Sequence, residues 1–213
     1  MHGQITLILC LIILYTSCSY RKHKSQSKYV TIIPYGNISQ EITDSLTVAI
    51  KRQYGYKTIL MSADTLPSAF INKEKGIRYS ASNTIDYLKG LKHDTVSFVV
   101  GITDADIYIT KKDKYSNIKQ PANKYKVWGI FGLAYKPGVS CIVSIRRLIH
   151  TNRGIMLSRI KKITLHEIGH NHGLHHCQNK TCLMTDAVET ISTIDNANEA
   201  LCNDCMQQIS SAF

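Results

Sequence analysis

The sequence lacks internal repeats, low-complexity tracts and any arginine-rich segment, which excludes a repeat array and leaves no support for a nucleic-acid-binding module. Acidic residues are also scarce, because 15 Asp and Glu stand against 26 Lys and Arg, and the formal net charge is +11. This balance favours acidic surfaces or substrates as partners, and no nucleic acid is expected. With 44% hydrophobic and 19% charged residues, the 213-residue chain predicts one globular domain.

The N-terminal apolar run is too short to cross a membrane. Residues 5–15 span eleven positions, whereas a membrane-spanning helix needs about 20. We therefore interpret residues 1–17 as a signal peptide. The run ends in Thr-Ser-Cys at Cys18, which resembles a bacterial lipoprotein signal whose cysteine carries the lipid anchor. An uncleaved anchor and an ordinary secretory signal are the alternatives, and the expected location is an exported, membrane-anchored protein or a secreted one.

The remaining chain predicts a polar tether over residues 18–28 and a catalytic domain over residues 29–213. Strands and helices alternate at first and strands dominate later, which indicates an α/β fold with a mixed sheet and packed helices. Ser39 and the pair Ser192 and Asp195 are expected to cap helices. The predicted strands are 29–36, 57–61, 95–103, 107–110, 126–135 and 140–148, and the predicted helices are 39–55, 82–91, 155–172 and 193–210.

Two histidines four residues apart indicate a metal site. His166 and His170 lie on a predicted helix, so their side chains point to the same side, one turn apart. Two imidazoles placed in this way can bind one Zn²⁺ at about 2.0–2.1 Å each. Glu167 lies beside them, close enough to act on water without binding the metal. The pattern is the H-E-x-x-H of zinc peptidases.

The pattern continues beyond the helix. Gly173 ends the helix and lets the chain turn, and His176 follows three residues later, where it can bind the same metal. The full pattern H-E-x-x-H-x-x-G-x-x-H resembles the metzincin signature. This resemblance implies that Met184 supplies the methionine of a turn beneath the site.

Two neighbouring histidines compete for a role at the metal. His172 lies about 200° around the helix from His170, so it faces away and is expected to be exposed or to lie behind the ligands. His175 has a different spacing from Gly173, but an exchange of His175 and His176 as third ligand stays open.

Three protein ligands leave one coordination position open for water, and Zn²⁺ lowers the pKa of such a water to about 7. Glu167 is expected to take its proton as general base and to pass it to the leaving amine. The expected reaction is therefore the hydrolysis of a peptide bond in a peptide or protein substrate.

Four cysteines extend the pattern. Cys177 directly follows the last of the three histidines, four residues separate it from Cys182, and Cys202 and Cys205 form a C-x-x-C pair. Residues 166–205 match the pattern H-E-x-x-H-x-x-G-x-x-H-C-x4-C-x-M-x17-C-x-x-C, which resembles the archaemetzincin family at every motif position. The resemblance implies a metzincin-like fold with an active-site helix and a small C-terminal subdomain, in which the four cysteines hold a second, structural Zn²⁺.

The cysteine spacing supports this second site independently. Cys202 and Cys205 are three apart on a predicted helix, so their sulfurs share a face, and four thiolates leave no position for substrate. Disulfides, for instance Cys177–Cys182 and Cys202–Cys205, are the alternative in an exported protein. Cys141 lies in an apolar strand and is expected to be a buried core residue.

We therefore expect a monomeric zinc metallopeptidase with two Zn²⁺, anchored to a membrane through lipid on Cys18. The alternative from another class is a non-catalytic zinc-binding surface lipoprotein, against which an intact Glu167 counts. A third interpretation is an adhesin that uses its basic face. The basic, turn-rich segment 111–126 is expected to be a solvated loop, with substrate steering as its functional alternative.

Overall fold

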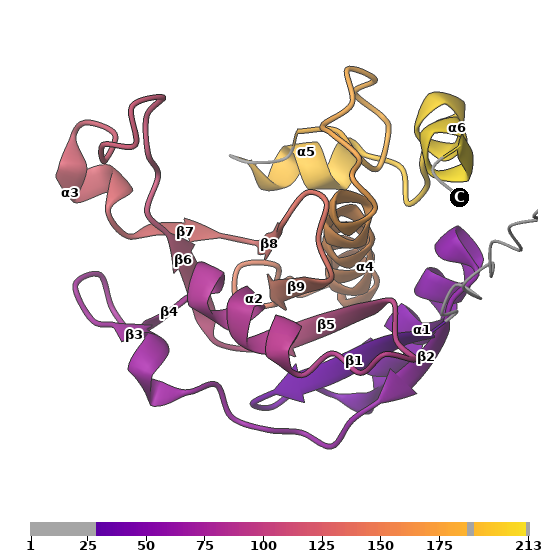
Figure 1. Cartoon of the computed structure of the whole chain (residues 1–213), viewed down its shortest axis with the longest axis horizontal. Helices are drawn as coiled ribbons and strands as arrows, with labels where there is room; N and C mark the ends of the chain where they lie inside the picture. Colours follow the sequence, from indigo (N-terminus) through magenta and orange to yellow (C-terminus); the bar gives the residue numbers. More distant parts are fainter. Residues whose placement is uncertain (1–28, 187–189, 212–213) are drawn as a thin grey trace, which may run out of the picture.

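The structure is a computed structural model that describes residues 29–186 and 190–211 (Figure 1). The predictions of a signal peptide, of a tether and of lipidation at Cys18 lie outside the described residues. Within the described ranges, no helix combines the length and the apolar character that a membrane span requires.

A five-stranded sheet forms the centre of the fold, in the order β2-β1-β5-β9-β8. The first four strands of this order pair in parallel, and β8 pairs antiparallel with β9 and forms one edge. All residues of β5 and β9 are buried, as the apolar sequence of these strands predicts. The strands are β1 (Tyr29–Tyr35), β2 (Lys57–Leu60), β5 (Phe98–Thr103), β8 (Gly132–Ala134) and β9 (Ser140–Ser144).

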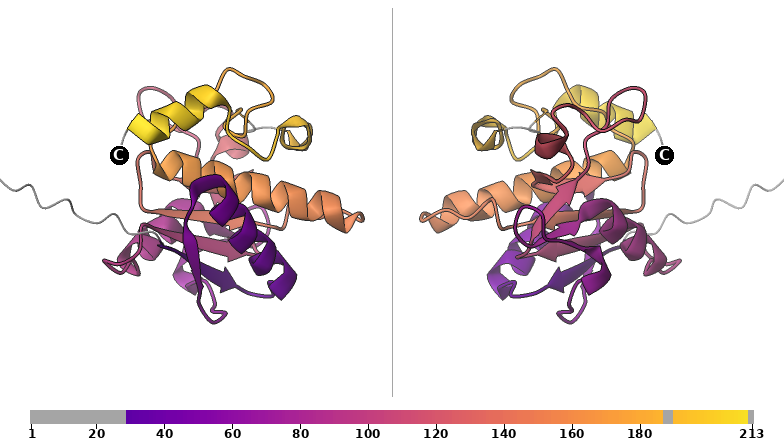
Figure 2. Two further views of the ribbon diagram at one scale, coloured as in Figure 1. Left: turned by 90° about the vertical axis from the view of Figure 1, so that its right-hand side faces the viewer. Right: turned by 90° about the vertical axis from the view of Figure 1, so that its left-hand side faces the viewer.

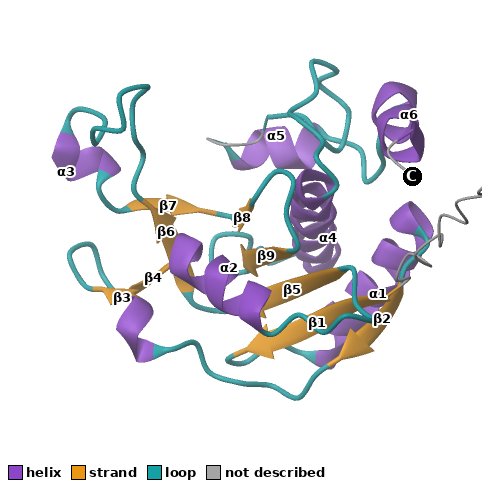
Figure 3. Cartoon of the chain, viewed as in Figure 1, coloured by secondary structure: helices purple, strands orange, loops and turns teal. Residues whose placement is uncertain are grey.

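Helices cover both faces of this sheet (Figure 3). Alternate residues of β5, such as Val99 and Val100, belong to two separate apolar clusters. One cluster contains α1 (Gln40–Tyr54) and α4 (Arg153–Asn171), and the other contains α2 (Ala81–Gly90). The helices expected over 39–55, 82–91 and 155–172 are confirmed, although Ser39 precedes α1 without a side-chain capping bond.

A second, four-stranded sheet has the order β3-β4-β6-β7. Its strands are β3 (Ile71–Asn72), β4 (Arg78–Ser80), β6 (Asp106–Ile109) and β7 (Trp128–Ile130). A 3-10 turn, η1 (Ser68–Phe70), precedes β3, and the short helix α3 (Ala122–Tyr125) lies between β6 and β7. The single strand expected over 126–135 is therefore two strands, since β7 pairs with β6 and β8 pairs with β9. Phe131 joins the two sheets, and its carbonyl accepts a hydrogen bond from Ser144 N–H at 2.8 Å.

The last helix also differs from the prediction. Instead of one helix over 193–210, the structure has α5 (Ile191–Asn196) and α6 (Asn203–Ser211), which lie above α4 in Figure 2. The segment between them leaves the helical path because Asn198 N–H donates to Thr181 O and Leu183 N–H donates to Ala200 O. The predicted capping box of Ser192 and Asp195 is also wrong, because α5 begins before Ser192 and Thr190 takes the N-cap position.

Candidate metal centres

Helix α4 positions the first two histidines. Its start is capped by the Asn152 side chain, which accepts a hydrogen bond from Ile155 N–H, and its apolar face is buried in the core. His166 and His170 therefore stand one turn apart at the C-terminal half of the helix. Their ring centroids are 4.6 Å apart. The helix thus presents two imidazoles to the same pocket.

The turn after α4 adds the third histidine. Gly173 adopts a φ of 93°, which favours glycine, and its N–H donates to His170 O at 2.8 Å. Leu174 then buries its side chain, and the chain returns toward the helix. One ligand atom from each of His166, His170 and His176 lies within 4.8 Å of the others. The Nε2 atoms of His170 and His176 are 3.2 Å apart.

The three histidines fit a tetrahedral metal. Zn–N bonds of about 2.0–2.1 Å place two ligand nitrogens about 3.3 Å apart, close to the observed 3.2 Å. His166 Nδ1–H donates to Leu183 O and His170 Nδ1–H donates to Leu174 O, each at 2.8 Å, which leaves both Nε2 atoms as acceptors. Burial lowers the pKa of His166 to about 3 and that of His170 to about 4. Both rings are therefore neutral at neutral pH, as metal ligands must be.

Glu167 lies in the same pocket as the histidines. The pocket is lined by residues 130–134 of the β7–β8 segment and by Ile163, His166, Glu167, His170 and His176. Burial raises the pKa of the Glu167 carboxyl to about 8. Its carboxylate packs against the backbone of Gly132, where an added Cβ would lie 2.7 Å from Oε1. Only glycine at this position leaves room for the carboxylate as it stands.

The two competing histidines are placed elsewhere. His172 is not exposed and does not approach the three ligands, since its ring stacks on Tyr54 and Tyr56 and meets Phe98 edge-on, with a centroid distance of 4.8 Å to Phe98. This aromatic environment buries the ring and lowers its pKa to about 4. His175 is exposed, and its Nδ1 accepts a hydrogen bond from Lys136 Nζ at 2.8 Å. The structure therefore brings His176, and not His175, to the other two.

Met184 is fully buried beneath α4, where its sulfur packs against Gly169. Its carbonyl accepts a hydrogen bond from Cys177 N–H at 2.8 Å. Met184 therefore joins the underside of the active-site helix to the start of the cysteine cluster.

The four cysteines form a second cluster. Their sulfurs lie within 4.8 Å of one another, and the separations Cys177–Cys202 and Cys182–Cys205 are both 3.8 Å. Zn–S bonds of about 2.3 Å in a tetrahedron place two sulfurs about 3.8 Å apart, whereas a disulfide needs about 2.05 Å. All described cysteines, including the fully buried Cys141, are free thiols. The geometry thus fits a four-thiolate metal site and not the disulfide alternative.

Backbone N–H groups point at two of these sulfurs. Cys182 Sγ accepts from Cys202 N–H at 3.3 Å and from Met184 N–H at 3.4 Å. A hydrogen bond from Cys205 N–H lowers the pKa of Cys202, while burial raises the pKa of Cys182 and Cys205. Cys202 directly precedes α6, and only Cys205 lies within the helix. The N–H donors favour thiolates, which metal binding requires.

The sequence did not reveal the groups that orient the histidines. Leu174 O and Leu183 O are backbone acceptors, which carry no residue-type signal. Asp186 is different, because its carboxylate lies 3.5 Å from His176 Nδ1. A carboxylate two residues after Met184 could have been considered from the sequence, since metal-bound histidines commonly donate to one.

Three histidines on an open pocket, with a buried carboxylate beside them, are the arrangement of a zinc peptidase, and the closed cysteine cluster suits a structural metal. The comparisons with known proteins agree with this class. The chain belongs to peptidase family M54, whose model matches residues 23–211. It is therefore a zinc metallopeptidase that acts on peptide substrates, and the resemblance to archaemetzincins is confirmed.

Curated relatives and solved structures extend over most of the chain. The archaemetzincin of Halobacterium salinarum is 24% identical over 189 residues, which are 84% of this chain and 98% of the relative. That of Methanocaldococcus jannaschii is 27% identical over 186 residues, with 84% and 92% covered.

The crystal structure of archaemetzincin from Methanopyrus kandleri matches with a TM-score of 0.72 and 24% identity, and covers 89% of this chain and 97% of its own. The Archaeoglobus fulgidus structure, complexed with malonate, matches with a TM-score of 0.66 and 20% identity, covering 84% and 99%. These likenesses establish the α/β fold that the sequence predicted.

Proposed function

We propose that this chain hydrolyses peptide bonds at the pocket between β8 and α4, with Zn²⁺ held by His166, His170 and His176 and with Glu167 as general base. The observation that carries the proposal is the buried Glu167 carboxylate in the wall of the pocket that the three histidines line. Zinc in such a site acidifies water and polarises a carbonyl group.

Glu167 suits proton transfer near neutral pH. Its desolvated carboxyl has a pKa raised to about 8, so it binds a proton more readily than an exposed glutamate. We assign it to accept the proton of the attacking water and to deliver that proton to the leaving amine. Gly132 leaves room for the carboxylate in the wall of the pocket, since an added Cβ would lie 2.7 Å from Oε1.

The edge strand β8 suits an extended substrate. It is the last strand of its sheet, and all three of its residues line the pocket. A peptide can add to such an edge through main-chain hydrogen bonds, and antiparallel pairing is slightly more stable per residue than parallel pairing. We therefore place the substrate antiparallel to β8, so that its C-terminal side runs from Ala134 toward Ile130.

Glu167 also argues against a non-catalytic zinc-binding protein. Burying a carboxyl group without a cationic partner raises its pKa and costs stability, and a site that only binds metal gains nothing from it. The same cost argues against an adhesin that uses only its basic face.

We also propose a second Zn²⁺ on Cys177, Cys182, Cys202 and Cys205, with a structural role. The sulfur separations of 3.8 Å and the N–H donors around Cys182 support this assignment. Four protein ligands leave no position for substrate.

The test is cleavage of a mixed-sequence peptide library by the purified, zinc-loaded protein, read by mass spectrometry. Glu167→Ala is the inactive variant, and Glu41→Ala, an exposed carboxylate paired with Arg153, is the matched control. Cuts that persist in Glu41→Ala and vanish in Glu167→Ala support the proposal. Cuts of equal rate in Glu167→Ala would refute the role of Glu167, and no cuts by a protein with a filled histidine site would favour the zinc-binding alternative.

Export and anchoring stay proposals that rest on the sequence of residues 1–18. We propose that the chain is an exported, monomeric lipoprotein with lipid on Cys18, because an apolar run of signal-peptide length ends in Thr-Ser-Cys. The mass of the N-terminal peptide, compared with that from Cys18→Ala, tests this. An unmodified cysteine with cleavage elsewhere would point to a secreted protein.

A further inference from the structure

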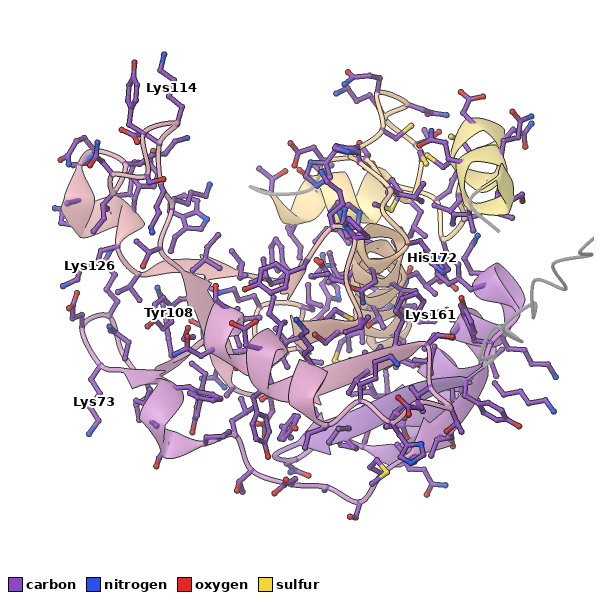
Figure 4. All side chains as sticks on the ribbon, viewed as in Figure 1. Lys73, Tyr108, Lys114, Lys126, Lys161 and His172 are labelled. Carbon is purple, nitrogen blue, oxygen red and sulfur yellow. The ribbon has the colours of Figure 1, made fainter. Side chains whose placement is uncertain are left out.

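One end of the molecule carries a dense group of lysines. We define the basic projection as residues 110–127, which connect β6 to β7 and include α3, together with the β3–β4 turn at residues 73–77 (Figure 4). It contains eight lysines and two acidic residues, which gives it more than half of the formal net charge of +11. Its lysines are Lys73, Lys75, Lys111, Lys112, Lys114, Lys119, Lys124 and Lys126.

The two parts of the projection are held together. Lys126 Nζ lies 2.6 Å from Glu74 Oε1, and Lys75 Nζ donates to Lys124 O at 3.3 Å. Asp113 accepts hydrogen bonds from backbone N–H groups of its own turn, including Tyr115 N–H at 2.8 Å. Both acidic residues therefore serve the internal structure of the projection. Lys112, Lys114 and Lys119 stay exposed on its surface.

Aromatic rings stiffen this surface. Trp128 stacks on Tyr125 with ring centroids 5.4 Å apart, and Lys111 Nζ lies 4.1 Å from the centroid of the Trp128 ring. Lys124 Nζ lies 5.2 Å from the Tyr125 ring. These contacts hold cationic groups in place at the base of the projection, which lowers the entropy lost when they bind an anion.

The projection is continuous with the catalytic pocket. Trp128 begins β7, and Ile130 and Phe131, two and three residues further along the chain, line the pocket. Figure 1 shows the connection with α3 at the β7 end of the β7–β8 segment and the helix α5 beyond its β8 end. A substrate antiparallel to β8 would run past Phe131 and Ile130 toward Trp128, and so toward the lysines.

We propose that the basic projection binds acidic residues of the substrate on the C-terminal side of the cleaved bond. The inference rests on the proposed peptidase function and names a substrate class for it: polypeptides with Asp or Glu several residues after the cleavage point. Steering and holding of acidic segments by spaced lysines is favourable at low ionic strength and weakens as salt rises.

An acidic polypeptide fits this surface better than nucleic acid does. Binding of single-stranded nucleic acid commonly relies on bases that stack on open aromatic faces. Trp128 already stacks on Tyr125 and lies under Lys111. The ring of the exposed Tyr115 lies under Lys114 Nζ at 4.9 Å. A polypeptide needs only spaced cations beside an edge strand, and the projection and β8 supply both.

Binding can be measured without catalysis. We would titrate Glu167→Ala protein with dye-labelled peptides that share one apolar core and carry four Glu after the core, four Glu before it, or four Gln after it. Fluorescence anisotropy gives Kd, and emission from Trp128, the only tryptophan of the chain, reports occupation of the projection. The peptide with Glu after the core should bind about tenfold more tightly than the Gln peptide, with a loss of this advantage at high salt.

Charge removal locates the binding surface. The triple variant Lys112→Gln, Lys114→Gln, Lys119→Gln should remove most of that advantage and the change in Trp128 emission. The matched control is the triple variant Lys51→Gln, Lys57→Gln, Lys89→Gln, which removes three lysines that are exposed outside the projection. It should retain both the tighter binding of the acidic peptide and the change in Trp128 emission.

The outcomes separate this inference from the proposed function. Three results would overturn the inference. The three peptides could bind with equal Kd, or both triple variants could lose the advantage of the acidic peptide equally. Trp128 emission could also change with an oligonucleotide or with anionic vesicles but not with the acidic peptide. Selective binding by the Glu167→Ala protein, together with no cleavage by the zinc-loaded wild-type protein, would instead refute the proposed peptidase function and leave an acidic-peptide-binding surface.

Discussion

The histidine cluster and the cysteine cluster meet in sequence at His176 and Cys177, but they differ in ligand number, in access and in neighbours. The histidine cluster offers three ligand atoms and lines an open pocket with a buried carboxylate in its wall. The cysteine cluster offers four ligand atoms, and two of its residues, Cys182 and Cys205, are almost fully buried. A free coordination position beside a base permits chemistry, whereas a closed set of thiolates holds chain segments together.

The two clusters share one short segment of chain. Cys177 directly follows His176, and Cys182 directly precedes Leu183, whose carbonyl orients His166. The cysteine cluster can therefore position two of the three histidine ligands without any contact with the substrate. We expect the two clusters to separate under mutation into a catalytic part and a structural part.

The largest effect is expected from breaking the cysteine cluster. Cys205→Ser should lower the free energy of unfolding by several kcal/mol and reduce the bound zinc by one equivalent, because a structural zinc contributes its binding energy to folding. Thermal unfolding and zinc analysis measure both. The matched control is Cys141→Ser, which removes a buried thiol outside the cluster and should leave the zinc content unchanged. Unchanged zinc in Cys205→Ser would contradict the assignment.

The next effect concerns catalysis alone. Glu167→Gln should lower kcat by about 10² to 10⁴-fold, the typical contribution of a general base, with both zinc equivalents retained. Steady-state cleavage of a peptide found in the library, beside zinc analysis, checks this. A variant that loses zinc as well as activity would place Glu167 among the ligands and not beside them.

A smaller effect is expected on the pH dependence of the free energy of unfolding. It should appear in protein whose histidine cluster has been emptied by a mild chelator while the cysteine cluster stays loaded. The folded-state pKa of Glu167 is about 8 and its ordinary value is 4.5, so the folded state binds the proton more tightly. Its contribution to stability is therefore fully present below about pH 4.5 and is lost as the pH rises to about 8.

Glu167→Gln has no carboxyl group that ionises, so the variant should not lose this stability as the pH rises. The variant should exceed the wild type in stability by on the order of 3 kcal/mol near pH 8, and the two should converge near pH 4.5. Denaturant unfolding at several pH values measures the difference. A difference that does not change with pH would show that Glu167 is already ionised in the metal-free fold.

The smallest effect is expected from Gly132→Ala. The new methyl group would lie 2.7 Å from Glu167 Oε1 and should displace the carboxylate, so that kcat falls about tenfold while zinc content and KM change little. Gly90→Ala, where nothing lies within 4 Å of the added methyl, is the control. An unchanged kcat would mean that the carboxylate reaches its working position from elsewhere.

Local patterns in the sequence predicted much of this structure. The helical spacing of His166 and His170, the turn at Gly173 and the cysteine spacing bring the ligands together as expected, and the buried strands β5 and β9 follow from their apolar runs. The histidine site and the strands depend on residues near one another in the chain or on composition. The cysteine pairs are 25 and 23 residues apart, and their meeting was expected from the archaemetzincin resemblance.

Contacts between distant segments could not be predicted. The helix expected over 193–210 is broken because Asn198 pairs with Thr181, and the strand expected over 126–135 divides because its halves join different sheets. His172 was expected to be exposed or to lie behind the ligands, but it stacks on Tyr54 from α1. In each case, the outcome depends on pairing with another segment of the chain, and the pattern of the segment itself does not encode that partner.

The most direct test of the two-cluster account is stepwise removal of zinc, with released metal, peptide cleavage and folded structure followed in the same sample. We predict two phases: the first zinc equivalent leaves with the loss of cleavage while the fold persists, and the second leaves together with unfolding. A single phase, or one zinc whose removal abolishes cleavage and structure at once, would contradict the separation of the two clusters.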